Sequence, residues 1–161
     1  MRASWWSRNP ERSQCPAGSP SALRVLLLAA SVPLLLRILK LPDLRFWLEP
    51  RGAVPPPPTP EAVAAMIRRI DRLLAAGRPM VRPGCLTRGV TLYYFLRRAG
   101  ADVSLCFGMG EVQGALEGHC WIVCQGEPLA ERRDPRPIFA ETWRIDPLPP
   151  GPLFRSPARN G

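Results

Sequence analysis

Four consecutive prolines, Pro55–Pro58, place the strongest constraint on how this chain can fold. Proline lacks a backbone N–H and clashes with the preceding helical turn, so the run cannot lie inside a helix. It is expected to form a stiff, extended spacer. The spacer, at residues 50–60, divides the sequence into an apolar helical segment at 21–49 and a candidate domain at 61–148.

The helix expected directly after the spacer has signals at both ends. Thr59 is a suitable N-cap, Pro60 fits the first helical position, and Gly77 suits the C-terminal cap. Between these ends, apolar residues recur at three- and four-residue spacing, which predicts an amphipathic helix with one buried face. The apolar residues are Val63, Met66, Ile67, Ile70, Leu73 and Leu74.

The apolar segment ahead of the spacer is too short to span a membrane. Its uncharged run, 25–36, lies between Arg24 and Arg37 and contains Pro33. A spanning helix needs roughly 20 apolar residues. The segment therefore predicts a kinked or two-part helix, which either packs on the domain or lies in a membrane interface.

The amino-acid composition bears on the cellular compartment and on whether the chain binds nucleic acid. The chain has five cysteines, an odd number at spacings that suggest no disulfide framework, and it begins with no cleavable signal, so a reducing cytoplasm is expected. Its net charge is +9. Lys40 is the only lysine, and the arginines are scattered rather than gathered in a stripe, which argues against a nucleic-acid-binding protein. The ends, 1–20 and 149–161, are expected to be disordered tails.

The second half of the chain predicts an α+β fold with a small antiparallel sheet packed on a helix. A helix should begin at Cys85, after Gly84, and stop at Gly100. Strands are expected over 102–110 and from 118, with a turn at 125–128 leading into a third strand that reaches Glu131. On the second strand, His119, Trp121 and Val123 should share one face, and Cys120, Ile122 and Cys124 the other.

Cys85 is the first candidate for chemistry. Free N–H groups and the positive end of the dipole at a helix N-terminus favour a thiolate. The same N–H groups can hold the oxyanion of a tetrahedral intermediate. The alternative is that Cys85 is a small buried residue filling space beneath a turn.

His119, the only histidine in the chain, is the candidate general base. A hairpin turning at 125–128 would bring Glu131 alongside its strand, although a shift of one residue would turn Glu131 to the other face. A core histidine and a solvated edge glutamate are the alternatives. Cys120 and Cys124 are too far apart along a strand to form a metal site, so no metal and no other cofactor is expected.

The order of a cysteine at a helix N-terminus, a histidine on a following strand and then a carboxylate resembles papain-like and transglutaminase-like cysteine enzymes. More specifically, residues 61–133 resemble the B protein of lasso-peptide maturation, a leader peptidase of the transglutaminase-like superfamily. The motifs that carry the resemblance are Cys85-Leu86, Arg97-Arg98 with Gly100, His119 with Trp121, and Glu131. A Leu- and Arg-rich stretch at 22–48 also matches loosely.

The resemblance implies a papain/transglutaminase-like fold and a cysteine endopeptidase that removes the leader from a ribosomally made precursor peptide. Cys85 would be the nucleophile, His119 the base, Glu131 the orienting acid, and Trp121 a wall of the substrate pocket. The implied partners are the precursor, a separate leader-recognition protein and a macrolactam-forming ligase. The chain departs from the family in two ways: the acid is glutamate where aspartate is usual, and the residues before 61 show no leader-recognition domain, so the resemblance is to the split form of the protein. The glutamate and the short domain favour an alternative, a non-catalytic binding or scaffold module of the same fold.

Overall fold

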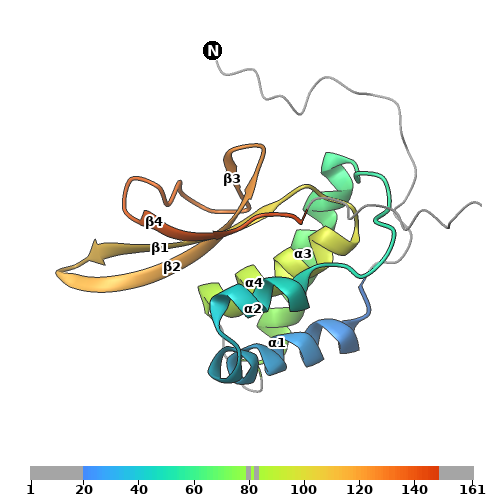
Figure 1. Ribbon diagram of the computed structural model, residues 1–161, viewed down its shortest axis with the longest axis horizontal. Coiled ribbons are helices and arrows are strands. Elements are labelled where there is room, and N and C mark those ends of the chain that lie inside the picture. The colour runs from blue at the N-terminus through green and yellow to red at the C-terminus, as the bar shows by residue number, and fades with distance from the viewer. Residues whose placement is uncertain (1–19, 79–80, 82–83, 149–161) are drawn as a thin grey trace, which may run out of the picture.

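The computed structural model describes residues 20–78, 81 and 84–148. The tails predicted at 1–20 and 149–161 lie outside this range, apart from Pro20. Within it, four helices precede a four-stranded antiparallel sheet (Figure 1). The elements are α1 (Ala22–Ile38), α2 (Leu41–Leu48), α3 (Pro60–Ala76), α4 (Cys85–Arg98), β1 (Ser104–Val112), β2 (Ala115–Cys124), β3 (Glu127–Leu129) and β4 (Ala140–Ile145).

Helix α4 lies between the other helices and the sheet. It packs against β2 and β1 on one side and against α1 and α3 on the other, and the strand order is β3-β2-β1-β4. Val90, Leu92, Tyr93 and Leu96 of this helix are fully buried. This mixed arrangement of helices and a small antiparallel sheet is the fold class expected from the sequence.

The helix ends follow from the local signals that predicted them. The Thr59 hydroxyl accepts a hydrogen bond from the Ala62 N–H at 3.3 Å, Pro60 opens α3, and Gly77 caps its C-terminus. Val63, Met66, Ile67 and Ile70 form the buried face of α3, so the predicted amphipathic helix is confirmed. Helix α4 begins at Cys85 as expected, and Gly100 adopts a positive φ of 87° after its end.

The apolar segment ahead of the prolines folds as two helices that dock on the domain. Helix α1 ends at Ile38 and α2 begins at Leu41. Helix α1 contacts α3 and α4 and buries Val25, Leu28, Ala29 and Val32. Of the two modes expected, packing on the domain is thus present. No helix among the described residues is long and apolar enough to cross a membrane.

A buried polar network joins α2 to α4. The Glu49 carboxylate, at the end of α2, accepts a short hydrogen bond from the Tyr93 hydroxyl, and its other oxygen lies 3.2 Å from Arg97 Nη2. Arg97 also donates to the Ala101 carbonyl at 3.0 Å. The side chains of Glu49 and Arg97 are almost fully buried, so each charge depends on the other for compensation.

The two faces of the sheet have different neighbours. Cys120 and Ile122 belong to the core shared with the helices. Trp121 and Val123 pack with Cys106 and Phe139 in a smaller cluster on the opposite face. The alternation predicted for this strand is therefore confirmed for these positions.

Three features of the sheet differ from the sequence-based expectation. Strand β2 begins at Ala115 instead of 118, because Gln113 and Gly114, both at positive φ, form a tight turn that pairs β1 with β2 along their whole length. Strand β3 ends at Leu129, because Ala130 at φ 62° turns the chain out of the strand before Glu131. Strand β4 was not expected, since five of its six residues are exposed and its pattern lacks a buried face.

The buried network makes Glu49 a sensitive test of how the N-terminal helices are held. Glu49→Ala should lower the free energy of unfolding by about 3–5 kcal/mol, because it leaves Arg97 buried without a counter-charge. Glu127→Ala is the matched control. It removes a pair with Arg136 whose side chains are both about half exposed, and should change stability by less than about 1 kcal/mol. Urea unfolding measures both values, and equal effects would contradict this role for Glu49.

Candidate active site

Cys85 occupies the N-terminus of α4 and is partly exposed. The N-cap residue, Gly84, has no side chain to accept a hydrogen bond from the first turn. The free N–H groups of that turn are therefore available to a negative charge beside Cys85. The helix places a cysteine where its thiolate is electrostatically favoured.

The thiol of Cys85 lies against the edge of β2. Its Sγ is 3.9 Å from the Gly118 carbonyl oxygen. The thiol and the backbone N–H of Cys120 both donate to the Cys85 sulfur. Gly89, one turn further along α4, permits this approach. A Cβ at Gly89 would come within 2.9 Å of Cys120 Sγ and 3.1 Å of Leu105 Cδ1. The glycine thus allows α4 and β2 to pack closely enough for Cys85 to meet the strand.

These contacts lower the pKa of the Cys85 thiol to about 5. The hydrogen bond from the Cys120 thiol has the largest effect, partial burial opposes it, and the Cys120 N–H and the His119 imidazole lower the pKa further. The hydrogen bond to Cys85 and burial raise the pKa of Cys120 far above its usual range. Burial also raises the pKa of Cys106 to about 12. Cys85 is therefore the thiolate of this group, and Cys120 keeps its proton.

His119 is positioned by two aromatic rings and a carboxylate. Its ring stacks on Trp121, with 6.0 Å between centroids and 16° between planes, and lies 5.0 Å from the ring centroid of Phe139. Its Nε2 is 3.4 Å from Glu131 Oε2. The same imidazole also interacts with the Cys85 thiol.

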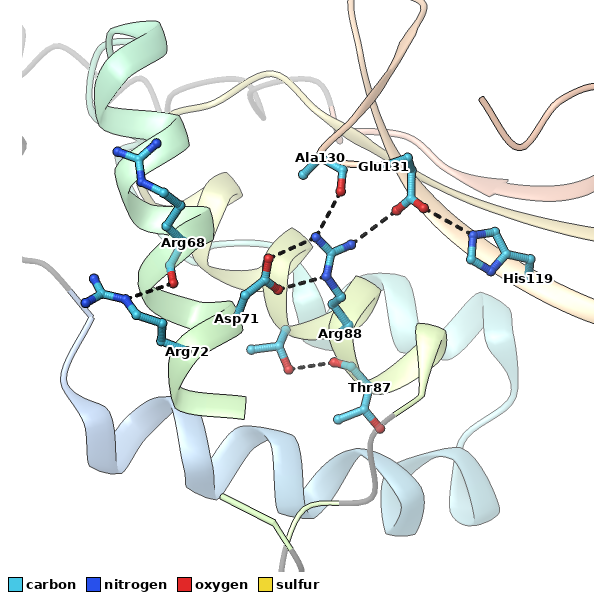
Figure 2. A network of polar contacts seen from close by, with 9 residues as sticks. Arg68, Asp71, Arg72, Thr87, Arg88, His119, Ala130 and Glu131 are labelled. Carbon is cyan, nitrogen blue, oxygen red and sulfur yellow. Dashed lines mark hydrogen bonds and ion pairs between the residues drawn. The ribbon is translucent and has the colours of Figure 1, made fainter. Parts of the chain in front are cut away.

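Arg88 holds Glu131 in place and links it to α3 (Figure 2). Its guanidinium binds both carboxylate oxygens of Asp71, at 2.8 and 3.1 Å, and donates to Glu131 Oε1 at 3.1 Å. It also donates to the Ala130 carbonyl at 3.1 Å. Although burial lowers the pKa of Arg88, the hydrogen bond and charge of Asp71 and the charge of Glu131 raise it overall. The cation therefore fixes the position of the segment that follows β3.

A hollow of about 230 Å³ adjoins Cys85 on the helical side. Asp71, Leu74, Thr87 and Arg88 contribute to its lining, together with Gly84 and Cys85. The hollow combines an apolar wall with the polar Asp71–Arg88 pair, so it offers room for a side chain of a bound molecule next to the thiol.

The structure brings together the three residues singled out from the sequence, Cys85, His119 and Glu131. Trp121 lies beneath the His119 ring with only 1 % of its surface exposed, and its role as a pocket wall stays a prediction. The roles of Arg88 and Cys120 are not predicted from the sequence. Arg88 had one available signal, its position one helical turn after Cys85. No set of three or more metal-ligating side chains gathers within the described part of the chain.

The match to known families agrees with this geometry. Residues 26–144, well over half of the chain, match the family model of the transglutaminase-like superfamily. The chain belongs to the transglutaminase-like superfamily. No curated protein and no solved structure matches the chain significantly.

The extent of the transglutaminase-like match is informative about the fold. It begins within α1 and ends within β4, so it includes helices α1 and α2 as well as the segment around Cys85, His119 and Glu131. The resemblance seen in the sequence motifs was confined mainly to 61–133. Helices α1 and α2 share one core with α3, α4 and the sheet, which agrees with the longer match.

The low pKa of Cys85 predicts its reactivity with iodoacetamide. Because the thiolate is the reactive form, the alkylation rate of Cys85 should reach half its maximum near pH 5. Cys124, whose pKa burial raises, should react only at much higher pH. Mass spectrometry of digested samples identifies the modified cysteine. A half-maximum for Cys85 near pH 8.5 would contradict the arrangement described here.

Matched variants of Cys120 separate the sources of this shift. Cys120→Ala removes the strongest hydrogen bond to the thiolate and should move the half-maximum for Cys85 to higher pH, while Cys120→Ser keeps a donor and should move it less. His119→Ala should also raise the pH of half-maximal alkylation of Cys85. If none of the three changes moved the half-maximum, the contacts with β2 would have no influence on Cys85.

Proposed function

We propose that this protein is a cysteine endopeptidase that removes the leader from a ribosomally made precursor peptide, as in lasso-peptide maturation. The observation that supports this most is the placement of Cys85, at the N-terminus of α4, beside His119 and in front of Glu131. The superfamily commonly contains cysteine peptidases. The motifs around these residues resemble those of the lasso-peptide B protein.

The proposed reaction begins with attack of the Cys85 thiolate on the carbonyl carbon of the scissile peptide bond. The developing oxyanion is stabilised by the backbone N–H of Cys85 and the positive end of α4. The tetrahedral intermediate collapses, the C–N bond breaks, and the His119 imidazolium gives its proton to the departing amine. A thioester to Cys85 remains.

Hydrolysis of the thioester completes the cycle. Neutral His119 accepts a proton from the attacking water, the C–S bond breaks, and the carboxylic acid leaves with Cys85 restored as thiolate beside the imidazolium. Glu131 holds the His119 ring through Nε2, and Arg88 holds Glu131. Arg88 is in this account a positioning residue, because it acts through Glu131.

The remaining parts of the proposal concern partners and location. The protein acts in the cytoplasm on a precursor peptide, with a separate leader-recognition protein and a ligase that closes the macrolactam on the new amine. Peripheral membrane contact through 22–48 is part of the proposal, and the exposed Leu23, Leu27, Leu34 and Ile38 of α1 are the side chains available for it. The site itself requires no metal and no organic cofactor.

Two substitutions test the roles of the nucleophile and the acid. Cys85→Ala should reduce cleavage of the precursor to the level of a control without enzyme, while leaving the unfolding midpoint nearly unchanged because the side chain is partly exposed. Glu131→Gln should lower kcat/KM by about 100-fold, since it weakens the orientation of His119 but keeps the nucleophile. Cleavage is measured by mass spectrometry of the released fragments.

Each variant has an outcome that would contradict its assignment. Cleavage by Cys85→Ala would exclude Cys85 as the nucleophile. Equal rates for Glu131→Gln and the natural protein would remove Glu131 from the reaction. A folded protein with a reactive Cys85 thiolate that binds the precursor without cleaving it, also in the presence of the leader-recognition protein, would favour a scaffold role.

A further inference from the structure

Strand β2 is much longer than its outer neighbour. It runs over ten residues, Ala115–Cys124, but β3 pairs only with its last three, Ile122–Cys124. Within the described chain, no strand pairs with the outer edge of β2 from 115 to 121. Figure 1 shows the turn end of the β1–β2 hairpin extending beyond the helical layer.

The register determines which backbone groups lie on that edge. The two-residue turn at Gln113-Gly114 makes Val112 and Ala115 a hydrogen-bonded pair. Pairs alternate along an antiparallel ladder, so odd-numbered residues of β2 bond to β1 and even-numbered residues direct N–H and C=O outward. Pairing of Ile122 with Leu129 of β3 agrees with this assignment.

Cys85 lies at the point where the open edge meets β3. Its thiol contacts the outward carbonyl of Gly118 and the outward N–H of Cys120. The next outward groups along β2 are the N–H of Gly118 and both backbone groups of Leu116, whose side chain is 74 % exposed. The open edge therefore leads directly to the thiolate.

Two sequence features keep this edge accessible. Natural edge strands are commonly protected by lysine, proline or a bulge, and residues 115–121 contain neither lysine nor proline and pair with β1 without a register shift. Gly118 is also not required by the fold. A Cβ there would meet only Met109 Sδ at 3.4 Å and the Gly108 carbonyl at 4.0 Å, both ordinary contacts. A strand glycine without a packing reason marks a place where another backbone can approach closely.

From these observations we infer that the outer edge of β2 at Leu116–Gly118 binds the peptide substrate as an added strand in line with β3. Backbone hydrogen bonds to Leu116 and Gly118 hold the peptide extended and direct the carbonyl to be attacked toward Cys85. Recognition through the backbone makes this segment of the substrate tolerant of sequence. The inference rests on the proposed peptidase function and adds to it the surface on which the substrate is held.

Amide hydrogen exchange of the full-length Cys85→Ala variant tests this binding without requiring cleavage. The probe is a degenerate mixture of decapeptides with blocked ends. At a concentration that occupies about 90 % of the protein, the amides of Leu116 and Gly118 should exchange about ten times more slowly, because each is free in only a tenth of the molecules. The amides of Gly114 and Gly126, in the two hairpin turns, should be unaffected.

A matched pair of variants distinguishes backbone pairing from side-chain contact. Leu116→Pro removes the outward N–H without removing a hydrogen bond to β1, whereas Leu116→Ala keeps the N–H and shortens the side chain. Added to Cys85→Ala, the proline should abolish the peptide-induced slowing at Gly118, and the alanine should leave it intact. Gly118→Ala, which the fold accommodates, should weaken peptide binding without lowering the unfolding midpoint.

The outcomes separate this inference from the proposed function. Absence of slowing at Leu116 and Gly118, or slowing at Gly118 that survives Leu116→Pro, overturns the inference. Incubating the natural protein with the precursor peptide and the leader-recognition protein reports on cleavage independently. Slowing without cleavage supports the binding edge and counts against the peptidase, whereas cleavage without slowing supports the peptidase and overturns the binding edge.

Discussion

The arrangement of the site depends on the Arg88 guanidinium. It contacts α3 through Asp71, the Glu131 carboxylate, and the backbone at Ala130 (Figure 2). Glu131 follows a short strand and lies after a residue at positive φ, so neither helix nor sheet hydrogen bonds fix its position. Arg88 supplies that restraint, and because it lies one turn from Cys85, the acid and the thiol are positioned from the same helix.

This restraint sets the arrangement of charged groups at the site. Glu131 lies between the Arg88 cation and the His119 ring, and the Cys85 thiolate lies beyond the histidine. The opposite charges of Arg88 and Glu131 stabilise each other where partial burial limits screening by water. The helix N-terminus and the Cys120 hydrogen bonds add to the stabilisation of the thiolate. The site therefore stabilises a thiolate at the N-terminus of α4.

Local signals in the sequence were sufficient for the elements that carry the main candidates. Caps at Thr59 and Gly77 predicted α3, and the position of Cys85 after Gly84 predicted the start of α4. The period-two pattern placed Trp121 and Val123 on one face of β2. These features depend on backbone preferences of a few neighbouring residues, and they are therefore visible before the fold is known.

The remaining features depend on contacts between distant residues. Arg88 is one of many scattered arginines, and only the fold selects it by placing Asp71 and Glu131 around it. The hydrogen bond from Cys120 to Cys85 depends on Gly89, which lets α4 pack close to β2. A single glycine within a helix gives no sequence signal that it has this role. Strand β4 has little apolar pattern of its own. It forms through backbone pairing with β1, which a sequence pattern does not reveal. Sequence motifs thus located the candidate residues, and long-range packing determined what holds them.

The most direct test of the account is to trap the covalent intermediate. The natural protein is mixed with the precursor peptide, quenched in acid within milliseconds to seconds, digested and examined by mass spectrometry for an acyl group on the fragment that contains Cys85. We expect a thioester on Cys85 that forms before free carboxylic acid is released and disappears as the acid accumulates. Cleavage of the peptide with Cys85 unmodified at every time point would contradict it.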